Sequence, residues 1–430
     1  MTKKEFKAAM SRGLGRCVYA VRQEPEKYRD IVLWGCRGNI AYDAQSEGTR
    51  SWYVYTMANC YPDKETFIGA AAEALRKYRP RGGWDLLHLS ELLMFFAMDG
   101  YESARLTLEN KYQEILAGML ARKKRRDGVF HELSDLEQLG LVLAVDSKSF
   151  LRVAGDFGRL YRDKNYLYDG DFAWFFADKG SRYRKTMEAA ARKNENIACF
   201  VRREQADVDA QEEQRQQRKE SLPDNLAGIR LSRWLAKKAD PETVERYART
   251  YREQSEPEAR AEALRAFGWC PYPCDPQPVI EDTQSGNEKL RKTAWRALEN
   301  LRHPAVREFA HSNAAKGDRT SENFALLVTN YISQDAALLE SLLRELISKK
   351  NWDHVHAAGM DIYRAFRKDS GIPHPKHLLP LLYEYNPCSY CRESALHYMA
   401  KHRMLTGEIL EECLWDSNYD IRSYAAKRRK

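Results

Sequence analysis

The chain contains 430 residues, of which 43% are hydrophobic and 31% are charged, and it includes 24 tyrosines and 9 tryptophans. This composition is typical of a folded protein and excludes an intrinsically disordered chain. No run of about 18 apolar residues occurs, which excludes a transmembrane helix.

Charge and cysteine content further narrow the class of protein to which the chain can belong. Lysine and arginine number 70 and aspartate and glutamate 62, so the net charge is +8, with both signs interspersed. This excess permits nucleic-acid binding without requiring it. The nine cysteines are odd in number and mostly lie in apolar surroundings, which favours reduced thiols. Because the first residues have no apolar segment typical of a secretory signal, we expect a cytoplasmic protein with no membrane partner.

Apolar residues recur at helical spacing along the whole chain, and alternating strand patterns closed by hairpin turns are not found. In the first half, breaks at Pro, Gly, Asp and Asn predict helices over 2–21, 28–36, 65–78, 84–98, 104–122, 130–145, 150–161 and 171–184. A further helix is expected between a cap at Ser46 and Pro62. The helix expected over 84–98 is strongly apolar, so we expect it to be buried.

The densest basic run in the chain follows the helix expected over 104–122. It consists of Arg122, Lys123, Lys124, Arg125 and Arg126. Basic residues at the end of a helix complement its macrodipole and bond its last carbonyl groups, so a charged helix end is the favoured interpretation. The alternative is a patch that contacts the phosphates of a nucleic acid.

The composition changes between residues 202 and 225, where large apolar residues are almost absent. This segment is either an exposed helix held by charge pairs or a linker. We therefore expect an amino-terminal helical region with degenerate repeats over 1–201, the charged segment over 202–225, and a carboxy-terminal repeat region over 226–430. Further helices are expected over 230–238 and 241–253.

A helical pattern centred on an arginine recurs in the carboxy-terminal half. In the stretch LRKTAWRALENL, Arg291 is followed by small or apolar residues at the third, sixth and seventh positions. Similar frames occur in PEARAEALRAF, CRESALHYMA and DIRSYAAKR, whose aligned arginines are Arg260, Arg392 and Arg422. Arg260 and Arg291 are 31 residues apart, and Arg392 and Arg422 are 30 apart, which is typical of stacked helix pairs.

Each position of the repeat has an expected structural role. Asn287 and Asn418 lie four residues before an aligned arginine, where a helix begins, and are predicted N-caps. In the same frame, Cys388 occupies the cap position and Cys391 occupies the buried position before Arg392. We expect the aligned arginines to bond carbonyl groups or acids of the neighbouring repeat and so to stabilise the fold.

These segments resemble HEAT repeats, particularly the short variety of the phycobilisome-lyase-like group. The resemblance is clearest over residues 255–310 and 386–430 and is degenerate elsewhere. It implies an α-solenoid, in which stacked helix pairs offer a curved surface to protein or nucleic-acid partners. Because HEAT motifs specify a fold and not a reaction, the resemblance implies no catalytic residue.

Two cysteine pairs are candidates for chemistry: Cys388 with Cys391, and Cys270 with Cys274. A four-thiolate zinc site would need both pairs together, and a redox dithiol would need one pair at a helix start. The pairs are more than 110 residues apart, too far to meet easily in a solenoid. We therefore favour structural cysteines and expect no metal and no cofactor, with thiol chemistry and zinc binding as alternatives.

The main histidine cluster consists of His354, His356, His374 and His377. His354 and His356 are two residues apart, so they point to different sides of a helix. Metal binding would require an acidic or thiol partner, and the sequence assigns none. We expect these histidines to lie on helix faces or at helix ends.

The pairs Trp84-Asp85 and Trp352-Asp353 raise one enzymatic alternative. Alkylpurine DNA glycosylases, a HEAT-like group, use an aspartate and an aromatic-lined concave face to excise damaged bases, which also requires a basic track for phosphates. No local motif of this chain matches that group residue by residue, and a tryptophan at a helix start is more often a packing anchor. Phosphate-loop, dinucleotide-binding, zinc-protease and nucleophile-elbow motifs are also absent.

We predict an all-α solenoid of HEAT-like helix pairs that serves as a non-enzymatic scaffold and binds a protein partner on its concave face. The alternative is a nucleic-acid-binding solenoid, including a DNA-glycosylase-like enzyme. A single stripe of arginines would favour nucleic acid, whereas scattered or acid-paired arginines favour the scaffold. The discriminating residues are Arg50, Arg122, Arg125, Arg126, Arg182 and Arg184.

Overall fold

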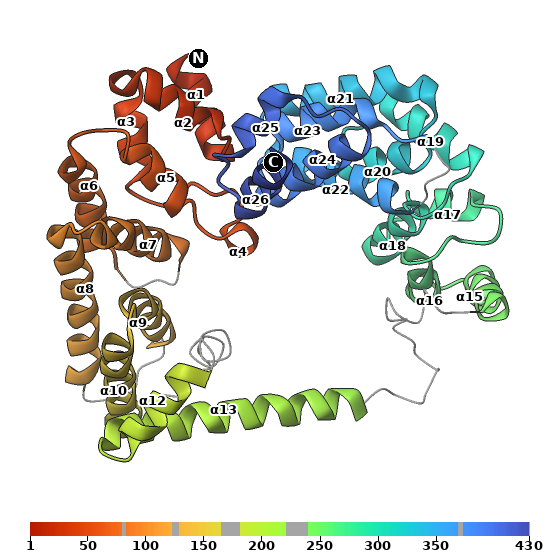
Figure 1. Cartoon of the computed structure of the whole chain (residues 1–430). Helices are drawn as coiled ribbons and strands as arrows, with labels where there is room; N and C mark the ends of the chain where they lie inside the picture. Colours follow the sequence, from red (N-terminus) through yellow and green to blue (C-terminus); the bar gives the residue numbers. More distant parts are fainter. Residues whose placement is uncertain (80–82, 123–128, 165–180, 221–239, 369–372, 430) are drawn as a thin grey trace. The chain divides into compact units, whose positions relative to one another are not determined.

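The computed structural model describes residues 1–79, 83–122, 129–164, 181–220, 240–368 and 373–429 (Figure 1). Throughout these ranges the regular secondary structure is helical, with no strand, which confirms the all-α prediction. None of the helices in the described ranges combines the length and the apolar character that a membrane span requires.

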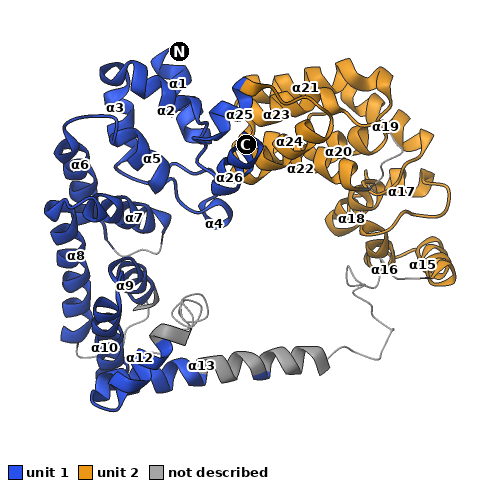
Figure 2. Cartoon of the chain, viewed as in Figure 1, with its two compact units in different colours: residues 1–222, 408–430 blue, residues 223–407 orange. Residues whose placement is uncertain are grey.

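Contacts divide the chain into two compact units (Figure 2). Unit 1 contains Met1–Leu222 together with Glu408–Lys430, and unit 2 contains Pro223–Gly407. The first change of unit falls within the charged segment over 202–225. The grouping of the last residues with the first unit was not predicted from the sequence.

Unit 1 begins with short helices and continues with longer ones. Its helices are α1 (Lys3–Arg12), α2 (Arg16–Gln23), α3 (Pro25–Gly35), α4 (Ala44–Glu47), α5 (Ser51–Ala58), α6 (Lys64–Lys77), α7 (Trp84–Met98), α8 (Glu102–Ala121), α9 (Val129–Leu143), α10 (Ser147–Lys164), α12 (Ser181–Ala191), α13 (Glu195–Glu220) and α26 (Tyr419–Arg428). Helix α25 (Gly407–Cys413) begins at the last residue of unit 2. Helix α7 has the bounds that the sequence predicts, and much of it is buried.

Glycines break two of the expected helices of unit 1. The helix expected over 2–21 is wrong, because α1 ends at Gly13, whose φ of +79° is left-handed and whose N–H bonds the carbonyl groups of Ala9 and Met10. A side chain there would also collide with Ser417. The helix expected from Ser46 is likewise two helices, since α4 ends at Gly48, with a φ of +71°.

Unit 2 is a series of helix pairs. Its helices are α15 (Pro241–Glu253), α16 (Pro257–Leu264), α17 (Gln277–Asp282), α18 (Glu288–Leu298), α19 (Pro304–Ala315), α20 (Ser321–Thr329), α21 (Ala336–Ser348), α22 (Trp352–Lys368), α23 (Leu379–Tyr385) and α24 (Ser389–Lys401). Short 3-10 turns lie at Arg265–Gly268, Ser333–Asp335 and Lys376–Leu378. The helix expected over 230–238 lies outside the described residues.

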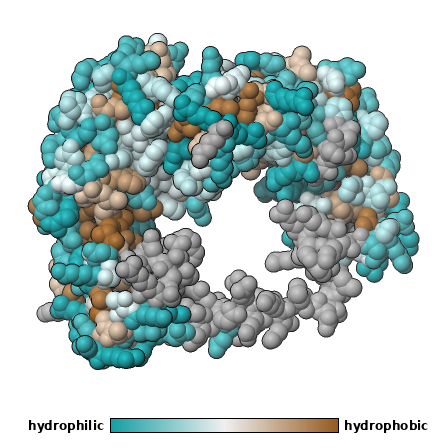
Figure 3. All heavy atoms as spheres, viewed as in Figure 1, coloured by the Kyte–Doolittle hydropathy of each residue, from teal (hydrophilic) through white to brown (hydrophobic). Residues whose placement is uncertain are grey.

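The helices of unit 2 pack in two layers. Helices α16, α18, α20, α22 and α24 form one layer, in which each helix contacts the next. Helices α15, α17, α19, α21 and α23 form the other, and each packs on the helix that follows it. Small buried residues at the repeat positions, including Ala263, Ala294 and Ala395, allow this close approach. Hydrophilic residues cover most of the face shown in Figure 3, and apolar residues appear there in small patches.

Three of the four aligned arginines make an equivalent hydrogen bond. In each of the three, Nη1 donates to the carbonyl oxygen six residues earlier, in the loop that leads into the helix. The pairs are Arg260 with Gln254 (3.4 Å), Arg291 with Ser285 (3.0 Å) and Arg422 with Asp416 (2.7 Å). The fourth, Arg392, is completely buried. Arg260 also donates to the Asp282 carboxylate of the following helix at 2.7 Å.

Two of the repeat positions are helix caps. The Asn287 side chain accepts a hydrogen bond from the Leu290 N–H at 3.0 Å and caps α18. The Asn418 side chain accepts from the Asp420 N–H at 2.7 Å and from the Ile421 N–H at 3.4 Å, and it caps α26. Each asparagine satisfies backbone N–H groups that the first helical turn leaves without a partner.

Candidate functional site

The basic run that begins at Arg122 is described only at its first residue. Arg122 forms an ion pair with Glu132, and its carbonyl oxygen accepts a hydrogen bond from Lys164 Nζ at 2.7 Å. Arg122 is thus held within unit 1, next to the end of α8. Lys123, Lys124, Arg125 and Arg126 lie outside the described residues.

Arg50 also makes contacts inside unit 1. Its guanidinium lies 3.1 Å from the Glu47 carboxylate, and each side chain is only 2% exposed. It also donates to the Ser417 hydroxyl group. Arg184 is exposed, and the side chain of Arg182 is outside the described part.

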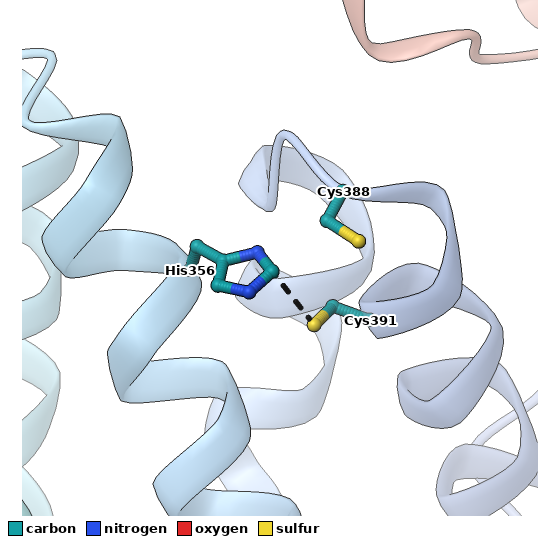
Figure 4. A group of neighbouring side chains, drawn as sticks. All are labelled: His356, Cys388 and Cys391. Atoms are coloured by element: carbon teal, nitrogen blue, oxygen red, sulfur yellow. Dashed lines mark hydrogen bonds between the residues drawn. The ribbon is translucent and has the colours of Figure 1, made fainter. Parts of the chain in front are cut away.

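Three side chains of unit 2 that carry metal-ligand atoms lie together (Figure 4). His356 is on α22, and Cys388 and Cys391 are at the start of α24. One ligand atom from each lies within 4.8 Å of the other two. The distance between Cys391 Sγ and His356 Nδ1 is 3.9 Å. Among the described residues this is the only such group of three, and we call it the Cys2His cluster.

The local fold explains this arrangement. Cys388 is the N-cap residue of α24 and Cys391 is its third helical residue, so both lie at the positive end of the helix dipole. Helices α22 and α24 contact each other directly. The buried Asn386 side chain joins them, because its Nδ2 donates to the Val355 carbonyl at 3.4 Å and its Oδ1 accepts from the Cys388 N–H at 3.1 Å.

Sequence reasoning missed this cluster because it sought a thiol partner for Cys388 and Cys391 only in the other cysteine pair. Cys270 and Cys274 are partly exposed and do not belong to the cluster. The signal that could have found it is the repeat period. His356 and Cys391 are 35 residues apart, close to one repeat, and residues one repeat apart lie on stacked helices.

The other histidines of the sequence cluster have different contacts. His354 is in the first turn of α22, and its Nδ1 lies 2.6 Å from Nδ2 of Asn351, the residue before the helix. His374 packs against the Phe366 ring, with 4.7 Å between ring centroids. His377 Nε2 lies 3.1 Å from the Ala336 carbonyl oxygen. The structure therefore brings only His356 to the two thiols.

A second feature of unit 2 is a cleft of about 330 Å³, which we call the Trp269 cleft. Its apolar lining is Trp269, Pro271, Val328, Ala365 and Pro373. Its polar lining is Asn300, Arg302, Thr329, Asp361, Arg364 and His374. A concavity that combines apolar side chains with polar groups able to fix the orientation of a ligand is the usual composition of a binding site.

Burial changes the acidity of Asp361, which lines this cleft, and of Glu299, which shares the Arg364 ion pair with it. Arg364 Nη1 lies 3.2 Å from both the Asp361 and the Glu299 carboxylates. Burial nevertheless raises the pKa of Asp361 to about 7, against the opposing effect of the Arg364 charge. Burial also raises the pKa of Glu299. A titratable group that changes charge near neutral pH therefore lines the cleft.

The two Trp-Asp pairs lie elsewhere. The Asp85 carboxylate accepts a hydrogen bond from the Asn39 N–H at 2.9 Å, and Trp84 begins α7 in unit 1. Trp352 and Asp353 begin α22 and do not line the Trp269 cleft.

No protein-family model matches this chain, and no curated protein matches it in sequence.

Proposed function

We propose that the chain is a non-enzymatic scaffold of HEAT-like helix pairs, and that unit 2 binds a segment of a protein partner in the Trp269 cleft. The two-layer packing of unit 2 and the resemblance of its repeats to HEAT motifs support the solenoid part of the proposal. A cytoplasmic location remains part of the proposal.

The observation that carries the proposal is that three of the described arginines pair with acids of their own unit. Arg50 and Arg122 pair with acids of unit 1, and Arg260 pairs with Asp282 in unit 2. Their charges are neutralised within the fold, so they do not supply a track for phosphates. This use of arginine supports a protein partner over a nucleic acid.

The lining of the Trp269 cleft indicates the chemistry of the bound segment. Trp269 is 40% exposed, so an apolar side chain of a partner would bury its ring. Arg302 is exposed at the same cleft and can donate to a carbonyl or carboxylate of the partner. The preferred ligand is therefore an extended segment with an apolar anchor next to a hydrogen-bond acceptor.

One observation favours nucleic acid as the second candidate partner. A concavity of about 620 Å³ in unit 2 is lined by Arg302, His303, Pro304, Arg307, Glu308, His311, Asn330 and Ile332. Its basic groups are those that phosphate contacts use. However, Arg307 and His311 both contact the buried Asp335 carboxylate, and Glu308 adds a second negative charge. A glycosylase-like activity belongs to this alternative.

The test is a pull-down from native lysate on the immobilised full-length chain, with and without nuclease. We expect a partner that survives nuclease, is retained by Trp84→Ala and is lost with Trp269→Ala. Trp84 is a matched control because it is also 40% exposed but lies in unit 1. Partners that disappear with nuclease, or that bind Trp269→Ala normally, would overturn the proposal.

A further inference from the structure

The Cys2His cluster combines three donor atoms that soft and borderline metal ions prefer. Two sulfur atoms and one imidazole nitrogen suit Zn(II) or Cu(I), whereas Mg(II) and Ca(II) prefer oxygen ligands. Cys388 and Cys391 are buried, and His356 is half-buried. The cluster is therefore shielded from bulk water on the thiol side and accessible on the imidazole side.

The spacing of the three groups is close to that of a tetrahedral zinc site. Zinc binds sulfur at about 2.3 Å and nitrogen at about 2.0 Å, which places tetrahedral ligands roughly 3.6–3.8 Å apart. The observed 3.9 Å between Cys391 Sγ and His356 Nδ1 is near that value. Every pair of ligand atoms lies within 4.8 Å, so no pair exceeds the tetrahedral spacing by more than about 1.2 Å.

The cap position of α24 differs from the other caps of the repeat. Asn287 and Asn418 accept hydrogen bonds from backbone N–H groups of their helices, whereas the Cys388 side chain makes no capping hydrogen bond. Cys388 is therefore a poorer cap than the asparagine that stabilises the helix at the same position of the other two repeats.

A buried hydroxyl group supplies an independent observation. Tyr363 lies on α22 and is 4% exposed, and its hydroxyl has no hydrogen-bond partner among the described residues. The Tyr363 side chain lies within electrostatic range of Cys391 and Cys388. A buried hydroxyl without a partner is destabilising, and a thiolate or metal-bound water would provide its acceptor.

We propose that His356, Cys388 and Cys391 bind one Zn(II) ion, with a fourth position left for water or an external ligand. The ion replaces the two thiol protons, which pass to solvent, and no electron is transferred. Asn386 holds the two sides of the site at their spacing through its bonds to Val355 and Cys388. The site is separate from the Trp269 cleft, so its test does not depend on the proposed scaffold function.

The experiment is a Co(II) titration of the full-length protein after chelator treatment and reduction. We expect one equivalent to bind with the sulfur-to-metal charge-transfer band and tetrahedral d–d bands of a thiolate site, and Zn(II) to displace it. Calorimetry of Zn(II) in two buffers should show proton release on binding. Absence of stoichiometric binding would overturn the proposal.

Variants assign the ligands. Cys388→Ser with Cys391→Ser should abolish the charge-transfer band, and His356→Asn should lower affinity by more than about 100-fold. Tyr363→Phe, which removes only the neighbouring hydroxyl, should lower it by about 10- to 100-fold. The matched control is Cys270→Ser with Cys274→Ser, which removes two thiols of the same unit and should leave binding unchanged. Circular dichroism of each variant confirms that it is folded.

Two results would identify other chemistry and overturn the metal proposal. One is an unchanged Co(II) spectrum in the cysteine variants or in folded His356→Asn. The other is a Cys388–Cys391 disulfide, found by mass spectrometry after mild oxidation, in a protein whose reduced form binds no Co(II). The second result would indicate a redox dithiol at a helix start.

Discussion

The repeat uses an arginine at this position because its side chain bonds the carbonyl oxygen six residues earlier. The charged guanidinium of Arg291 or Arg422 donates a hydrogen bond to a loop carbonyl oxygen that the helix itself does not satisfy. Arg422 also stacks on Trp52, with 3.6 Å between its guanidinium carbon and the ring centroid. Burial lowers the pKa of Arg422, against the effect of the Asp416 carboxylate. Three of the four aligned arginines therefore join a loop to the helix that follows it.

We predict that Arg291→Ala lowers stability before it affects binding. The change removes a charged hydrogen bond to the Ser285 carbonyl, so we expect a loss of about 1–2 kcal/mol and a melting temperature lower by roughly 2–6 °C. Arg344→Ala is the control, because Arg344 makes only an exposed pair with Glu340 and should change stability by less than about 0.5 kcal/mol. Loss of partner binding with an unchanged melting temperature would contradict a structural role.

We also predict that Asp361 makes unit 2 less stable as the pH rises. The folded protein keeps the Asp361 proton up to about pH 7, whereas the unfolded chain loses it near pH 3.8. Between these values the folded state binds more protons, so stability falls with rising pH and levels off above pH 7. Denaturant unfolding at pH 5 and pH 7.5 measures the fall. In Asp361→Asn the difference between the two pH values should shrink, and an unchanged difference would refute the assignment.

At the scale of the helix, short stretches of sequence decide where each helix begins and how it stacks on its neighbours. We predict that Asn287→Ala destabilises unit 2 by about 1 kcal/mol, because the α18 N-terminus loses its cap. Asn287→Ser keeps a side-chain acceptor at the same position and should stay close to wild type. Thermal unfolding of the three proteins measures this order, and equal stability of the Ala and Ser variants would show that the cap is not used.

These local signals explain how much of the molecule the sequence predicts. Helical spacing, the Asn287 and Asn418 positions and the arginine period lie within short stretches, so the all-α class and many helix bounds can be derived from them. The break at Gly13 was missed because glycine adjoins apolar residues that continue the helical pattern. The Cys2His cluster was missed for another reason: its ligands come from two helices, and only stacking of the repeats brings them together.

At the scale of the whole chain, the carboxy-terminal residues complete unit 1. The Ser417 N–H donates to the Gly13 carbonyl at 2.9 Å, and Arg16 forms an ion pair with Glu412 at 2.9 Å. The Tyr19 hydroxyl donates to the Glu411 carbonyl at 3.2 Å. These contacts join α2 and the preceding turn to residues almost 400 positions later in the chain.

We predict that Gly15→Ala loosens this contact. A Cβ atom at Gly15 would lie 1.9 Å from the Glu412 carbonyl oxygen, so the carboxy-terminal segment must move away, at a cost of about 1–3 kcal/mol. Hydrogen exchange should become faster in α25 and α26, with unit 2 unaffected. Gly118→Ala in α8, where a Cβ meets open space, should leave this exchange unchanged. Unchanged protection of α26 in Gly15→Ala would count against the contact.

The return of the chain to unit 1 also sets an order for synthesis. Unit 2 is an insertion in the sequence of unit 1, so all its residues are synthesised before Glu412 and Ser417. At typical translation rates of about 5–20 residues per second, the residues that contact α2 are made on the order of tens of seconds after α2 itself. We therefore expect the first helices of unit 2 to be able to fold during translation, whereas unit 1 reaches its final form only after Glu412 and Ser417 have been added.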